Sequence, residues 1–245
     1  MPLIVPGSMQ IGPRPSGSSE PATLPEYLAS IGKNSWYARF VAGTNMWTGA
    51  TLNGSAASLN GNVGSWGVDA ANTSNFSAYW TQSTGGNQPY YRAANGINSL
   101  YAVENNPSGA AETRHLQLSS TTALNGDYTV IVRHPILARD SRTPYSHNAT
   151  AFYWTTSTGS GQLLSGMGAG GSTSADQIIW VTRNTPGSSS GNCIIGISQT
   201  GTGHNNNAPY LLRRSTTYSS SAISEIWFTP QLTVTELDAA MTFIT

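Results

Sequence analysis

Residues 223–245 read Ile-Ser-Glu-Ile-Trp-Phe-Thr-Pro-Gln-Leu-Thr-Val-Thr-Glu-Leu-Asp-Ala-Ala-Met-Thr-Phe-Ile-Thr, a strand pattern followed by a helix pattern. Residues 223–228 combine β-branched and aromatic side chains, which suit a half-buried strand, and Pro230 ends it. Thr233 precedes Glu236 by three residues, the spacing of a capping box at a helix start. The stretch therefore predicts one strand that leads directly into one capped helix.

The predicted helix has a single apolar stripe. Leu237, Met241 and Ile244 recur at helical spacing, so we expect them to pack onto the rest of the domain. No other part of the chain has an equally convincing helix pattern. Elsewhere, short apolar runs alternate with Gly, Asn and Pro turn signals, which is typical of all-β sandwiches and jelly rolls. The predicted strands are residues 35–41, 128–133, 151–155, 177–183, 193–198 and 210–213.

The charge composition limits the classes of function that the protein can have. Charged residues make up 9% of the 245 residues and the formal net charge is +0, which removes the electrostatic argument for nucleic acid. Lys33 is the only lysine, and the other cations are arginines, which suit buried and interfacial contacts. Near-zero net charge favours association between copies. We therefore expect a protein that assembles with others and does not bind nucleic acid.

The sequence also limits the environment of the protein. Cys193 is the only cysteine, so no intramolecular disulfide can form, and its apolar neighbours indicate a buried small side chain. No stretch has the pattern of a signal peptide or of a transmembrane helix. We expect a chain made in a cytoplasm that stays soluble or joins an assembly there, without membrane insertion.

Residues 1–24 differ from the rest of the chain. Proline and glycine alternate there with a few apolar residues, and repeated proline favours extended backbone without a core of its own. One interpretation is a disordered tail. The other is an arm that orders against a neighbouring subunit, with Leu3, Ile4, Val5 and Ile11 as its anchors. We favour the arm, followed by one β domain over residues 25–245.

Several motifs occur in an order that resembles a known superfamily. They are Gly61-Asn-Val-Gly-Ser-Trp66, Thr81-Gln-Ser-Thr84, Asn87-Gln-Pro-Tyr90, Gly96-Ile-Asn98, Leu124-Asn-Gly-Asp-Tyr-Thr-Val130, Ser224-Glu-Ile226 and Leu232-Thr-x-x-Glu-Leu237. Together they resemble the concanavalin A-like lectin/glucanase superfamily, and more narrowly the laminin-G-like jelly-roll modules of tailed-bacteriophage virion proteins. The resemblance covers residues ~30–245. It implies a jelly-roll sandwich of two antiparallel sheets, with ligand or partner contacts on loops or on a concave face.

The chain departs from this superfamily in its acidic residues. The glucanase branch uses paired carboxylates on one strand, whereas the acidic residues here are isolated in sequence. Glu225 lies in the predicted last strand, and its neighbours offer it no partner, so we expect no enzyme. Calcium, which some members bind, needs clustered oxygen ligands. The only candidate oxygen ligands are Asp69 with Asn72 and Asn75, or Asp140 alone. We therefore expect no cofactor and keep calcium as an alternative.

Aromatic residues are the best candidates for ligand contact. Trp47, Tyr145 and Trp154 lie in or beside predicted loops, where an aromatic face could stack on a sugar ring. The alternative for each is packing or subunit contact, because Trp and Tyr are common in cores and interfaces. Trp66 is expected in the core. The four histidines, including His115, are scattered without zinc-ligand spacing.

With the resemblance, these features predict a non-enzymatic structural protein of a bacteriophage virion. It would decorate the capsid, as a head fibre does, or belong to the tail tip or tail fibre, and would present a lectin-like domain. The arm would hold it to capsid or tail proteins, and host-surface glycan is a further candidate partner. We expect a homo-oligomer, for which a trimer suits a projecting appendage. The alternative is a free carbohydrate-binding module or glycan hydrolase.

Overall fold

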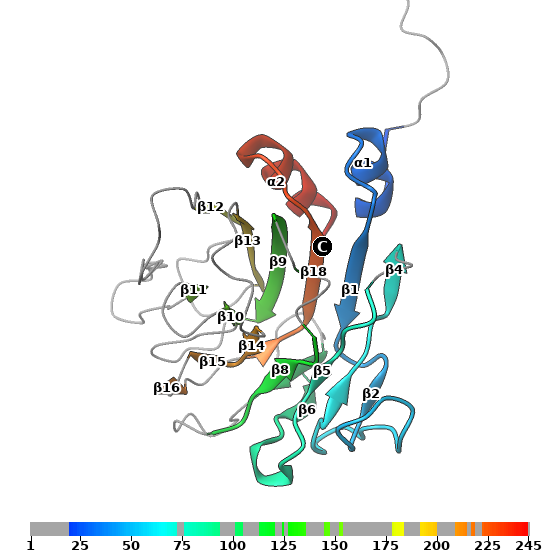
Figure 1. Ribbon diagram of the computed structural model, residues 1–245, viewed down its shortest axis with the longest axis vertical. Helices are drawn as coiled ribbons and strands as arrows, with labels where there is room; N and C mark the ends of the chain where they lie inside the picture. Colours follow the sequence, from blue (N-terminus) through cyan, green and yellow to red (C-terminus); the bar gives the residue numbers. More distant parts are fainter. Residues whose placement is uncertain are drawn as a thin grey trace, which may run out of the picture.

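The structure, a computed structural model, describes residues 20–72, 76–93, 101–104, 113–120, 124, 127–135, 145–147, 152–153, 178–183, 192–199, 209–214, 217–218 and 222–244. Within these ranges the chain is mostly antiparallel β-sheet with few helices (Figure 1). The all-β prediction is confirmed at this level, and so is the short C-terminal helix. Leu3, Ile4, Val5 and Ile11 lie outside the described residues.

The predicted last strand lies inside a six-stranded sheet. The order of this sheet is β12 (Ile178–Arg183), β13 (Asn192–Gln199), β9 (Tyr128–Pro135), β18 (Glu225–Pro230), β1 (Tyr37–Val41) and β4 (Ala70–Asn72). Strand β18 pairs with β9 on one side and β1 on the other, so its backbone hydrogen-bonding groups have partners on both sides. Both neighbours come from distant parts of the sequence.

A second large sheet has seven short strands. Its order is β11 (Phe152–Tyr153), β10 (Tyr145–His147), β14 (Tyr210–Leu211), β8 (Leu116–Leu118), β5 (Trp80–Thr81), β3 (Ser65–Trp66) and β2 (Met46–Trp47). Two small sheets accompany it. They are β17 (Ala222–Ile223), β7 (Tyr101–Glu104) and β6 (Tyr90–Ala93), and the pair β15 (Arg213–Arg214) and β16 (Thr217–Tyr218).

Both large sheets contribute to one hydrophobic cluster. Alternate residues of a strand point to opposite faces, and this places Phe40 and Phe228 of the six-stranded sheet in the cluster. Trp66 and Trp80 of the seven-stranded sheet join them, and all four side chains are fully buried. Ring centroids lie 5.9 Å apart for Phe40–Trp66 and for Phe40–Trp80, and such pairs add about 0.5–1.5 kcal/mol each beyond burial. The prediction that Trp66 belongs to the core is confirmed.

The opposite face of the six-stranded sheet carries a second hydrophobic cluster, with two helices. Trp227 and Ile131 point into it, and α2 (Val234–Ala240) with the following 3-10 turn η3 (Met241–Phe243) packs on them. Figure 1 shows α2 and α1 (Leu24–Ser30) at the same end of β1 and β18. The predicted stripe is confirmed, because its members are buried in this cluster: Leu237, Met241 and Ile244. The capping box of Thr233 and Glu236 is present as predicted.

The prediction of a single convincing helix was wrong, because α1 is a second one. Thr23 accepts a hydrogen bond from the Glu26 amide, and the Glu26 side chain bonds back to the Thr23 amide. Pro25 stands in the first turn, where a missing amide hydrogen costs nothing. The spacing of Thr23 and Glu26 is the same as that of the predicted cap, so the signal was present in the sequence. Leu24, the last residue of the predicted arm, is buried in this helix.

Two predicted strands are each divided between two sheets. Residues 223–228 were expected to form one strand, but the chain bends at Ser224. Ile223 belongs to β17 and pairs with β7, whereas Glu225 begins β18. Residues 210–213 likewise split at Leu212, which has φ 65° and is fully buried. Each bend directs one chain segment into two sheets. The position of the bend depends on which strands the two halves of the segment pair with.

Candidate functional site

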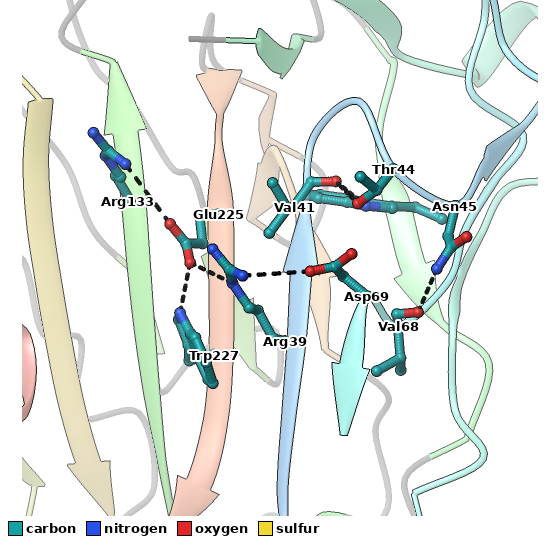
Figure 2. Close-up of polar contacts among 10 residues, drawn as sticks. Arg39, Val41, Thr44, Asn45, Val68, Asp69, Arg133, Glu225 and Trp227 are labelled. Atoms are coloured by element: carbon teal, nitrogen blue, oxygen red, sulfur yellow. Dashed lines mark hydrogen bonds and ion pairs between the residues drawn. The ribbon is translucent and has the colours of Figure 1, made fainter. Parts of the chain in front are cut away.

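The charged residues of the six-stranded sheet gather beside Trp227, on the face that carries the helices. In the sheet register, Arg39 is opposite Trp227, and Glu225 is opposite Arg133. Because residues two apart share a face, Glu225 and Trp227 point to the same side of β18. Figure 2 shows the side chains from β9, β18 and β1 converging, with Asp69 beside them. We call Arg39, Asp69, Arg133, Glu225 and Trp227 the charge cluster.

Glu225 is at the centre of the charge cluster. Its Oε1 atom accepts hydrogen bonds from Arg39 Nε at 2.8 Å and from Trp227 Nε1 at 2.7 Å. Its Oε2 atom forms an ion pair with an Arg133 guanidinium nitrogen at 3.7 Å. The Glu225 side chain is only 7% exposed. Both carboxylate oxygens are therefore occupied by donors of this chain.

Arg39 connects the buried carboxylate to the surface. One of its terminal nitrogens lies 3.4 Å from Asp69 Oδ2, and its guanidinium lies 5.2 Å from the centre of the Trp227 ring. Its side chain is 35% exposed and that of Asp69 is 26% exposed. The Asp69 amide donates to the Arg39 carbonyl at 2.7 Å, which fixes the position of the aspartate. This outer pair is solvated, whereas the Glu225 end is not.

Arg133 is the more buried of the two arginines, at 10% exposure. Burial lowers the pKa of its guanidinium, the Glu225 carboxylate raises it through charge and hydrogen bonding, and Arg39 lowers it further. The ordinary pKa of an arginine lies far above neutral pH, so Arg133 stays charged there. The positive charges of Arg39 and Arg133 then balance the negative charges of Asp69 and Glu225.

The loop after β1 is held next to the charge cluster. Thr44 Oγ1 donates to the Val41 carbonyl at 2.8 Å, and Asn45 Nδ2 donates to the Val68 carbonyl at 2.7 Å (Figure 2). Asn45 has φ 49°, a left-handed conformation that asparagine tolerates better than most residues. The Thr44 bond closes the turn after β1, and the Asn45 bond joins this loop to the segment that carries Asp69. The arrangement connects β9, β18, β1 and the segment before β4 through side chains as well as through the backbone.

The chemistry of the charge cluster is that of a structural ion-pair network. A general acid or base needs an oxygen that can reach a substrate, and Glu225 already uses both oxygens. The sequence expectation concerned only the residues adjacent to Glu225, which offer it no partner. Its charged partners lie on other strands, with Arg39 186 positions away in sequence, and no local pattern could indicate them. Asp69, the central residue of the calcium alternative, pairs with Arg39, whereas Asn75 and Asp140 lie outside the described residues.

The predicted glycan-contact residues are spread over the seven-stranded sheet. Trp47 is half-buried on β2, at one edge, and its ring packs over Gly67 beside Leu52. Tyr145 is on β10, five strand spacings of about 4.8 Å from β2 along the sheet, or about 24 Å. The side chain of Tyr145 and all of Trp154 lie outside the described part of the chain. The sheet order does not bring Trp47 and Tyr145 to one site.

The sequence reasoning missed a second polar cluster, at the loop that contains the 3-10 turn η1 (Gly85–Asn87). His115 Nδ1 lies 2.7 Å from the Thr113 carbonyl, which can only accept, so this nitrogen carries the proton. His115 Nε2 then accepts from Gln82 Nε2 at 3.0 Å. The Tyr90 ring lies within 4.7 Å of the Arg92 guanidinium carbon and 4.3 Å of the Arg114 one. Gln82 and His115 are 33 positions apart in sequence, and Arg92 is on β6, so motif spacing carried no signal.

No family model, curated protein or solved structure is significantly similar to the chain. Among the described residues, no three His, Cys, Asp or Glu side chains form a group that could hold a metal ion. No helix in the described ranges is long and apolar enough to cross a membrane.

Proposed function

We propose that this chain is a non-enzymatic structural protein of a bacteriophage virion, with a concanavalin A-like jelly roll as its display domain. The observation that carries the proposal is the occupied state of Glu225. The most deeply paired carboxylate of the six-stranded sheet receives two guanidinium groups and an indole, so it holds strands together. A rigid scaffold of this kind suits a module that presents loops to partners. The family assignment itself is supported by the order of the sequence motifs.

Two further features support a display role. The two large sheets share an aromatic core, and the opposite face of the six-stranded sheet is covered by two capped helices. The six-stranded sheet is therefore packed on both of its faces. The loops that follow β1 and β2 are presented from this scaffold. Trp47 stands at the sheet edge, half-buried, where one part of its ring is supported and another part reaches solvent. Such a ring could stack on a sugar of a host-surface glycan.

The arm hypothesis is tested by deletion of residues 1–19. This deletion keeps Thr23 and Glu26, and so it leaves the α1 cap intact, which deletion through residue 24 would not. We expect the shortened protein to melt at the same temperature as the full chain and to be missing from purified phage particles. Incorporation at the wild-type level would show that the arm does not attach the protein.

Glycan contact is tested on an array of bacterial surface glycans with the full chain and the Trp47→Ala variant. A matched control is Leu59→Ala, which removes a side chain that is 46% exposed in the same region. If the domain recognises glycan through this edge, Trp47→Ala abolishes micromolar binding and Leu59→Ala does not. Binding that survives in Trp47→Ala would place the contact elsewhere, and no binding by the full chain would leave decoration as the role.

A further inference from the structure

We propose that Asn53-Gly54 is a site of spontaneous backbone modification, at which asparagine cyclises and converts to aspartate and isoaspartate. The chain offers an internal comparison, because Asn60-Gly61 is the same dipeptide only a few residues away. Both asparagines are exposed, and both are left-handed, with φ 65° at Asn53 and φ 68° at Asn60. Composition and backbone class are therefore matched, whereas the hydrogen bonds around the two dipeptides differ.

Asn60-Gly61 is held by hydrogen bonds at each reacting group. The Gly61 amide donates to the Ser58 carbonyl at 2.8 Å, and the Asn60 amide donates to the Tyr91 carbonyl at 2.7 Å. The side-chain oxygen Oδ1 of Asn60 accepts from Arg92 at 2.6 Å. A nucleophile that is already bonded and a carboxamide that is clamped by a guanidinium cannot approach each other without breaking these contacts.

Asn53-Gly54 has less of this protection, because no described residue clamps its side chain as the Arg92 bond clamps Asn60. Among the described residues, neither the Gly54 amide nor the Asn53 carboxamide makes a hydrogen bond of good geometry. A turn over Leu52 and Asn53 directs the Gly54 amide toward the Thr51 carbonyl, which also accepts from the Ser65 hydroxyl at 2.9 Å. The loop is closed further back, where the Thr48 amide donates to the Ser55 carbonyl at 2.9 Å. The base of the loop is therefore paired, while the Asn53 carboxamide at its tip is exposed.

The reaction needs only water. The deprotonated Gly54 amide nitrogen attacks the Asn53 side-chain carbonyl carbon, and a new C–N bond closes a five-membered succinimide. The bond from that carbon to the side-chain nitrogen breaks, and the nitrogen leaves as ammonia after gaining a proton. Water then opens either ring carbonyl and yields aspartate or isoaspartate. Glycine is the residue that allows this approach best, because it has no Cβ beside the attacking nitrogen.

The product changes the loop in two ways. It adds one negative charge to a chain with a formal net charge of +0, and isoaspartate lengthens the backbone by one carbon. Leu52, the preceding residue, lies beside the Trp47 ring over Gly67. The modification therefore occurs next to the proposed glycan-contact residue. Any effect on glycan binding rests on the proposed function, whereas the modification itself does not.

Peptide mapping by mass spectrometry tests the proposal on the full-length protein, incubated in mildly alkaline buffer for days. We expect deamidation at Asn53 to proceed at least about tenfold faster than at Asn60, because Asn60 must first break several hydrogen bonds. In concentrated urea the two rates should converge, since the neighbours are identical and the fold no longer protects either. Equal rates in the folded protein, or faster reaction at Asn60, would overturn the proposal.

Two variants sharpen the test. Gly54→Ala places a methyl group beside the attacking nitrogen, and an added Cβ there would meet only the Thr51 carbonyl oxygen, at an ordinary 3.9 Å. The variant should fold normally and lose at least about nine-tenths of the Asn53 signal, given a tenfold slower attack. Asn53→Gln removes the site and should leave the Asn60 rate unchanged. A persistent Asn53 signal in folded Gly54→Ala would contradict the cyclisation route, and so the proposal.

Discussion

Replacement of Glu225 by glutamine is the most direct test of the charge cluster. Glu225→Gln keeps the shape of the side chain and one carbonyl acceptor, but it removes the negative charge and directs an amide group at cationic donors. The lost interactions are the 2.8 Å bond from Arg39 or the 2.7 Å bond from Trp227, together with the ion pair to Arg133. Arg133 is then left charged and buried without its carboxylate.

The expected loss is large because the site is dry. Removing one partner of a buried ion pair costs about 3–5 kcal/mol, since the remaining charge loses its counter-charge in a poorly solvated site. Asp69→Asn is the matched control, because it breaks a contact of the same Arg39 at a position where both side chains are partly exposed. Pairs of that kind contribute about 0–1 kcal/mol. Replacing Glu225 should therefore lower the free energy of unfolding several times more than replacing Asp69.

Urea unfolding followed by circular dichroism measures both variants, with a shared slope as evidence that the unfolded states are comparable. A third variant, Glu225→Leu combined with Arg133→Met, removes the buried charges together and should recover most of the stability that Glu225→Gln loses. The reasoning is refuted if Glu225→Gln lies within about 1 kcal/mol of the wild type, the range of a surface pair.

Three further predictions concern packing, capping and pH. Gly64→Ala should lower the free energy of unfolding by about 3 kcal/mol in urea titrations, since its Cβ would lie 2.3 Å from a backbone carbonyl oxygen, while Gly85→Ala, with open space around it, should change nothing. Thr23→Ala and Thr233→Ala should each cost about 1 kcal/mol, measured the same way, and a larger loss in either would mean more than a lost cap. Burial, and then the charge of a nearby glutamate, raise the pKa of Tyr27 above its ordinary value of 10.0. Folding stability from this tyrosine is therefore complete below about pH 10 and declines above it, so Tyr27→Phe should flatten the alkaline fall in melting temperature, and an unchanged fall would count against the assignment.

Local patterns predicted a good part of the fold. The β-branched and aromatic runs became strands β9, β12, β13 and β18, and the Thr233 cap and its stripe became α2. These features depend on neighbours within a few residues, where propensity and periodicity act. The same rule, applied to Thr23 and Glu26, would have identified α1. That helix was missed because its cap, Thr23, and its first residue, Leu24, were assigned to the extended arm.

The candidate site could not be predicted in this way. Glu225 is one carboxylate in an apolar strand, and its sequence neighbours give no sign of Arg39 or Arg133. Strand pairing places these residues side by side, and pairing is a long-range property that depends on every strand in the sheet. The separation of Trp47 from Tyr145 has the same origin, because strand order along the sheet does not follow the order of the chain.

The amino-acid pattern was thus sufficient for the β-rich class, the C-terminal strand and helix, and the buried position of Trp66, because each depends on local periodicity and on the removal of apolar surface from water. The fold in three dimensions was needed for the division of residues 222–230 between two sheets and for the partners of Glu225. Buried charges need counter-charges at close range, and only the packed arrangement of β1, β9 and β18 supplies them.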